Sequence, residues 1–121
     1  PQNAYVLNNY SYYLSLRGVR LDEAKKMAAR ANSIAPNTAA YEDTYGWVLY
    51  QLGDYAGAKE WIEKSMKNAG STDGTVLEHY GDVLYKLGDT NGAVEYWMKA
   101  KEQNVDSDTI DKKIAGKKLY D

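Results

Sequence analysis

Residues 45–54 spell Tyr-Gly-Trp-Val-Leu-Tyr-Gln-Leu-Gly-Asp, and residues 80–89 spell Tyr-Gly-Asp-Val-Leu-Tyr-Lys-Leu-Gly-Asp. Eight of these ten positions are identical at an offset of 35 residues. The match continues beyond them, because Gly57-Ala58 corresponds to Gly92-Ala93. Self-similarity at a fixed period of this length is the signature of a repeat architecture. The chain therefore contains at least two copies of one structural unit.

An earlier and more diverged copy precedes these two. Residues 9–14 align with residues 44–49, with Ser11 in the place of Gly46. Ala24 lies 34 residues before Ala58, so the turn between the two matches carries one extra residue. Insertions are tolerated best in exposed turns. We expect three repeats, at about 4–37, 39–72 and 74–106.

Each copy divides into two amphipathic halves. In the second copy, Tyr45, Val48 and Leu52 recur at the three-and-four spacing of one helix face, and Gly53 then ends the helix. Ala58, Trp61, Ile62 and Ser65 repeat this spacing in the second half. We expect helices near residues 3–17, 21–35, 39–52, 55–69, 74–87 and 90–104. The pattern predicts an all-α protein.

The segment that follows the repeats has the charge order of a helix. Acidic residues open it and lysines close it, which suits the helix dipole, while Ile110 and Ile114 form a thin apolar stripe. We expect a capping helix at about 107–120 that covers the last repeat. Its lysines 112, 113, 117 and 118 are expected to be solvated. The chain begins without Met, so we expect residues 1–121 to be a single domain from a longer chain.

Composition narrows the classes of function. The formal net charge is -2, which gives no basic field for nucleic acid, and there is no cysteine for thiol chemistry or disulfides. No stretch approaches the roughly 18 to 20 apolar residues that cross a membrane. We expect neither a nucleic-acid partner nor insertion into a membrane.

Residues that could carry chemistry are few. His79 is the only histidine, and without cysteine it cannot form the usual zinc sites, so we interpret it as a helix-surface side chain. Gly70 and Gly74 are not followed by the Lys-Ser or Lys-Thr of a phosphate-binding loop. We expect no catalytic residues, no metal and no cofactor.

The repeat resembles the tetratricopeptide repeat, in the form that bacterial members have. Small residues stand at the family's close helix contacts, with Gly46, Gly81 and Ser11 at the first, and Pro36 stands where the family ends a repeat. The resemblance implies an α-α superhelix of three helix-turn-helix repeats plus a C-terminal capping helix. The compartment stays open, and a bacterial parent that is secreted or lipid-anchored is compatible with the resemblance.

In this family the first helix of each repeat lines a groove that holds a peptide or a partner helix. Carried over to this chain, the groove residues are Tyr5, Asn8, Tyr12, Asp43, Trp47, Tyr50, Glu78, Asp82 and Tyr85. They combine aromatic anchors with carboxylates, so we expect a protein or peptide partner with apolar side chains and positive charge. The family's clamp for chaperone tails needs cations where this chain has Asn8, Thr75 and His79, which argues against that mode.

Two alternatives to the groove stay open. The aromatic side chains of the first helices could pack on one another and bind nothing. The chain could also be a purely structural or self-associating segment of a larger protein, because the exposed ends of a short repeat array can stack on copies of themselves.

Overall fold

The computed structural model describes residues 3–69 and 73–119, and its regular elements there are all helices. The helices are α1 (Ala4–Arg17), α2 (Leu21–Ile34), α3 (Ala39–Gln51), α4 (Tyr55–Ala69), α5 (Gly74–Lys86), α6 (Thr90–Glu102) and α7 (Ile110–Gly116). The all-α class and the six repeat helices are confirmed, with ends within two residues of the predicted ones. The final helix is shorter than predicted.

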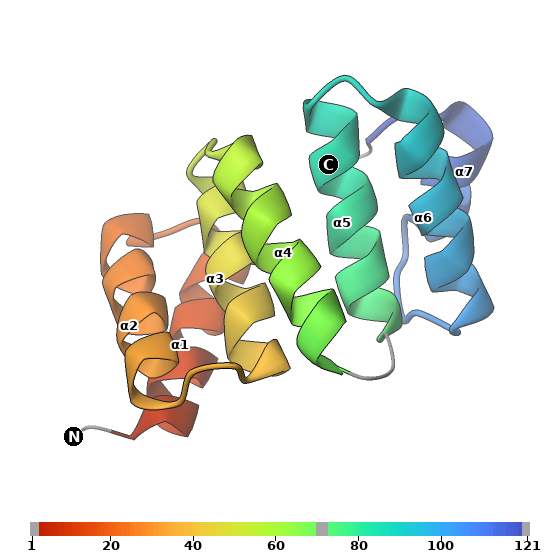
Figure 1. Cartoon of the computed structure of the whole chain (residues 1–121). Coiled ribbons are helices and arrows are strands. Elements are labelled where there is room, and N and C mark those ends of the chain that lie inside the picture. The colour runs from red at the N-terminus through yellow and green to blue at the C-terminus, as the bar shows by residue number, and fades with distance from the viewer. Residues whose placement is uncertain (1–2, 70–72, 120–121) are drawn as a thin grey trace. The chain divides into compact units, whose positions relative to one another are not determined.

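The helices gather into two compact units, residues 1–70 and residues 71–121. In the first unit α1 packs on α2, α2 on α3, and α3 on α4 as antiparallel neighbours (Figure 1). In the second unit α5 packs on α6, and α6 packs on α7. The helix pairs α1–α2, α3–α4 and α5–α6 are the three predicted repeats.

The turns inside the second and third repeats have the same structure, a glycine followed by a capping aspartate. Gly53 and Gly88 have φ angles of 88° and 92°, a left-handed conformation that glycine adopts without strain. The next residue is an aspartate in both turns, and it caps the following helix. The Gly57 amide donates to Asp54 at 3.0 Å, and the Gly92 amide donates to Asp89 at 2.9 Å. These contacts explain why Gly-Asp recurs at both positions.

The paired helices touch most closely at the small residues. A Cβ atom on Gly46 would lie 2.7 Å from Ile62 Cγ1, and one on Gly81 would lie 2.5 Å from Trp97. No real Cβ fits at those distances, so glycine is required for the helices to approach this far. The first repeat solves the same problem with Ser11, whose hydroxyl donates to the Ala24 carbonyl at 2.7 Å.

We expect Gly81→Leu to destabilise the second unit by at least ~1–3 kcal/mol, because a larger side chain must displace the buried Trp97 ring. Amide hydrogen exchange of α5 and α6 measures the loss locally. Ala29→Leu, at an exposed position on α2, is the control and should change stability by less than ~0.5 kcal/mol. Unchanged exchange in Gly81→Leu would contradict the close-contact assignment.

Candidate functional site

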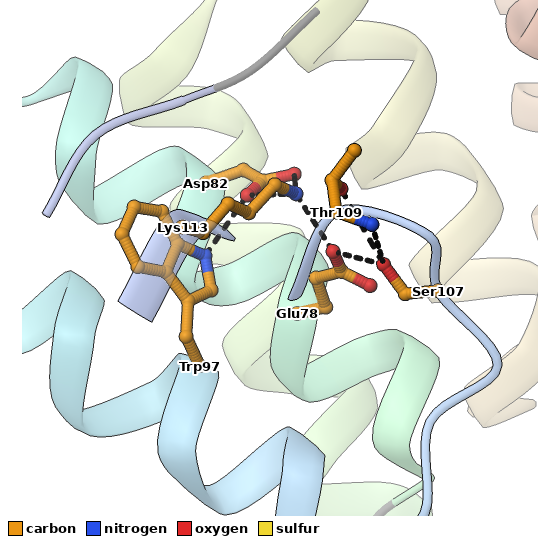
Figure 2. A network of polar contacts seen from close by, with 6 residues as sticks. All are labelled: Glu78, Asp82, Trp97, Ser107, Thr109 and Lys113. Carbon is orange, nitrogen blue, oxygen red and sulfur yellow. Dashed lines mark hydrogen bonds and ion pairs between the residues drawn. The ribbon is translucent and has the colours of Figure 1, made fainter. Parts of the chain in front are cut away.

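Two carboxylates of the predicted groove form a buried pair in the second unit. Glu78 and Asp82 lie one turn apart on α5, and both are buried. Lys113 reaches them from α7: its ammonium donates to Glu78 Oε2 at 2.7 Å and to Asp82 Oδ1 at 2.9 Å (Figure 2). One lysine side chain therefore joins the third repeat to the C-terminal helix.

Neighbouring groups complete the hydrogen bonding of this cluster. Trp97 Nε1 donates to Asp82 Oδ1 at 2.9 Å, and the Ser107 hydroxyl donates to Glu78 Oε2 at 2.8 Å. The Lys113 ammonium lies 5.9 Å from the centroid of the Trp97 ring, within the range of a cation–π contact. Figure 2 shows these side chains converging from α5, α6, α7 and the segment between α6 and α7.

Burial is the largest influence on both charged partners. It raises the pKa of Asp82 from 3.8, because loss of water disfavours the carboxylate more than Lys113 and His79 favour it. Burial also disfavours the ammonium of Lys113. Attraction to Asp82 and hydrogen bonds to Glu78 and Asp82 outweigh that effect, so the pKa of Lys113 is raised above 10.5. Lys113 is therefore charged in the folded protein at neutral pH.

Two sequence-based expectations are wrong in this unit. Lys113 was expected to be solvated with its neighbouring lysines, but it is only 6% exposed. It is buried because the carboxylates of α5 compensate its charge. His79 was expected on the helix surface, but it is also buried, near enough to Asp82 to influence the pKa of that carboxyl.

The groove residues of the first unit differ in their exposure to solvent. Tyr5 is 65% exposed and Tyr12 is half-buried, whereas Asn8 and Asp43 are buried. Trp47 is only 8% exposed. Most of the Trp47 side chain is therefore covered by the rest of the protein and cannot contact a partner.

Trp47 forms an aromatic stack with Tyr50. Its ring lies 4.5 Å from that of half-buried Tyr50, with the planes 8° apart, and Tyr50 in turn lies 5.5 Å from Tyr55. In the second unit, half-buried Tyr85 lies 6.1 Å from Trp97. Some of the predicted groove aromatics thus pack on each other.

A further buried carboxylate, Glu42, lies in the first unit. Glu42 on α3 is fully buried, and the Asn68 amide of α4 donates to both of its oxygens at 2.9 and 2.8 Å. Lys64 lies 3.9 Å away. Spacing alone gives no signal for this contact, because Glu42 occupies the place that apolar Leu77 takes in the next repeat.

The residues that the structure describes offer little for other chemistry. In residues 3–69 and 73–119, no group of three or more histidine, aspartate or glutamate side chains could hold a metal ion. None of the described helices has the length and apolar character needed to cross a bilayer.

Known proteins share this architecture. Residues 44–71 match the family model described as tetratricopeptide repeat. A stretch of 67 residues is 31% identical to the TPR repeat-containing protein PA4667 of Pseudomonas aeruginosa, covering 55% of this chain and 11% of that protein. The chain therefore corresponds to a small part of that relative.

Solved structures extend the likeness to nearly the whole chain. The first TPR of Spaghetti (RPAP3), solved bound to the HSP90 peptide SRMEEVD, gives a TM-score of 0.82 at 15% identity, covering 96% of this chain and 90% of that one. YrrB, described as a TPR protein with an unusual peptide-binding site, gives 0.71 at 26% identity, covering 85% and 52%.

Paired helices with a recurring glycine contact define this chain as a helical-repeat protein. The matches in sequence and in structure identify this repeat as similar to the tetratricopeptide repeat. Residues 44–71 match the tetratricopeptide repeat, and the chain has the fold of solved tetratricopeptide-repeat structures, as the resemblance of its sequence predicted.

We expect Lys113→Met to lower the stability of the second unit by about 3–5 kcal/mol, because it leaves two buried carboxylates without their cation. Lys101→Met is the matched control. Its ion pair with Asp111 is exposed, so its loss should cost less than about 1 kcal/mol. Adding Glu78→Gln and Asp82→Asn to Lys113→Met should recover part of the loss. Equal effects of the two lysine variants in amide exchange of α5 would contradict the buried pair.

The raised pKa of Lys113 also gives a pH dependence. Its stabilising contribution is fully present below pH 10.5 and is lost as the pH rises through the higher pKa of the folded state. We expect the difference in stability between wild type and Lys113→Met to become smaller as the pH rises through the pKa of Lys113 in the folded protein. Tyrosine ionisation affects both proteins, so the difference isolates the lysine. If this difference in stability stays constant up to the pH at which the proteins unfold, the raised pKa of Lys113 is contradicted.

Proposed function

We propose that this domain is a protein-interaction module that binds a partner segment on the first-helix face of its first unit. This face consists of Tyr5, Asn8 and Tyr12 on α1 and Asp43, Trp47 and Tyr50 on α3. One observation supports this choice over the third repeat. Lys113 covers Glu78 and Asp82, whereas Tyr5 is exposed to solvent and Tyr12 and Tyr50 are partly exposed.

The open tyrosines have the properties of binding anchors. Covering a side chain as exposed as Tyr5 removes apolar surface from water, at roughly 25 cal/mol per Å². Tyr50 stacks on Trp47 and makes a tilted ring contact with Tyr55, so it has little conformational freedom to lose when a partner binds. A rigid aromatic surface of this kind favours a partner with apolar side chains.

Charge has a smaller part than the sequence suggested. Two of the three acidic groove residues are Glu78 and Asp82, and Lys113 compensates them within the chain. The structure of the RPAP3 domain holds the HSP90 peptide SRMEEVD, which is acidic, but this chain has Asn8, Thr75 and His79 where the family's clamp for chaperone tails needs cations. An acidic tail is therefore a poor match for this domain.

One observation favours the alternative of a structural or self-associating segment. The outward face of α1 carries Val6, Tyr10 and Tyr13, all exposed. Apolar surface of this kind marks sites where proteins associate. Under this alternative the domain itself forms oligomers and its first-helix face binds no peptide.

Selection from a random peptide display library, followed by fluorescence anisotropy with the enriched peptides, tests the proposal. We expect peptides rich in apolar side chains, with binding weakened about tenfold or more by Tyr5→Ala or Tyr50→Ala. Tyr13→Ala is the control, because Tyr13 is also an exposed tyrosine of α1 but lies on the other stripe of that helix.

Two results would count against the proposal. Equal weakening by Tyr13→Ala would move the binding surface to the outward face of α1. Failure to enrich any peptide, together with a concentration-dependent oligomer in sedimentation that Tyr13→Ala dissociates, would support the self-associating alternative.

A further inference from the structure

One polar position recurs along the chain at intervals of 35 residues. It is occupied by Asn8 on α1, Asp43 on α3, Glu78 on α5 and Lys113 on α7. All four side chains are buried. Burying a polar group is costly unless a hydrogen bond replaces the water that it loses. Each of these four side chains therefore requires a partner for its polar atoms.

In the second unit, two members of this position satisfy each other. The Lys113 ammonium donates to Glu78 Oε2 at 2.7 Å, which joins α7 to α5 (Figure 2). The Ser107 hydroxyl donates to the same oxygen at 2.8 Å. An ammonium next to an oxygen acceptor is thus the arrangement that this position adopts when its hydrogen bonding is complete.

The first unit has the same position but lacks the donor. There Asn8 on α1 stands at the register of Asp43 on α3, and these two helices pack on each other. Asn8 Oδ1 is buried and accepts no hydrogen bond from the residues that the structure describes. An ionised carboxylate only accepts hydrogen bonds, so it cannot supply the donor. A buried acceptor without a donor is rare in native proteins, and it indicates a group that the free chain does not provide.

We propose that a lysine side chain of the partner donates a hydrogen bond to Asn8 Oδ1 and forms an ion pair with Asp43. This inference rests on the proposed function, because both residues belong to the first-helix face of the first unit. Charge supports a cation. Lys113 compensates Glu78 and Asp82, and Asp43 is the third acidic groove residue. A carboxylate accepts several hydrogen bonds, so Asp43 can receive an ammonium in addition to its contacts within the chain.

The surroundings of Asn8 suit the long stem of a lysine. Exposed Tyr5 precedes Asn8 by three residues and half-buried Tyr12 follows it by four, so the three share one face of α1. A lysine covers apolar surface with its stem while its ammonium reaches a polar group. Lys113 does this in the second unit, where its ammonium lies 5.9 Å from the centroid of the Trp97 ring. The site therefore recognises both parts of the side chain.

N-acetylated synthetic copies of the display-selected peptides test the lysine. We expect each peptide that depends on Tyr5 and Tyr50 to carry a lysine. Its replacement by norleucine, which keeps the stem and removes the charge, should weaken binding about tenfold or more in fluorescence anisotropy. Peptides that depend on the two tyrosines but tolerate norleucine, or contain no lysine, would overturn this inference and leave the proposed function standing.

Asn8→Leu separates a ligand contact from a structural one. The substitution removes an acceptor that has no donor within the described chain, so we expect the unfolding temperature of the free domain to stay unchanged or to rise. The affinity for the lysine peptide should fall about tenfold, to that of the norleucine peptide. Asn9→Leu, at the exposed neighbouring position, is the matched control and should bind both peptides as the wild type does.

Asp43→Asn keeps the shape of the side chain and removes its charge. We expect it to lose most of the preference for lysine over norleucine, while the affinity for the norleucine peptide stays within about twofold of wild type. The inference is wrong if Asp43→Asn or Asn8→Leu retains the full preference for lysine. A lower unfolding temperature for Asn8→Leu would also overturn it, because Asn8 would then have a structural partner within the chain.

Discussion

The close contact between the two helices of each repeat is the constraint on which the rest of this structure depends. At Gly46 and Gly81 the space for a Cβ atom is already filled by Ile62 and Trp97. The contact lets Ala58, Ile62, Ala93 and Trp97 be buried completely. Because it fixes how each helix pair is rotated, it also decides which side chains of the first helices point away from their partners.

The ion pairs of Lys113 with Glu78 and Asp82 change the role that we infer for the third repeat. By sequence, Glu78 and Asp82 form an acidic surface for a partner, but they are buried and bonded to a lysine of the same chain. A buried pair of this kind adds little net stability over apolar packing, yet losing one member is costly. Its more informative role is to fix where α7 lies.

Repetition made much of the fold predictable. The helix ends, the Gly-Asp turns and the contact at Gly46 and Gly81 recur at one offset, so each copy supports the interpretation of the other. The site was less predictable. Lys113 was grouped with solvated lysines, because its burial depends on residues 31 and 35 positions away that only folding brings near. The burial of Trp47 likewise depends on tertiary packing, which helix periodicity does not encode.

In the proposed function the first unit receives the partner, and the third repeat is closed by its own lysine. Amide and side-chain NMR shifts of the full domain, titrated with a display-selected peptide, test this most directly. We expect shifts at Tyr5, Tyr12 and Tyr50, with the Lys113 ammonium still bonded to Glu78 and Asp82. Release of α7 with shifts at Glu78 and Asp82, and none at the three tyrosines, would contradict it.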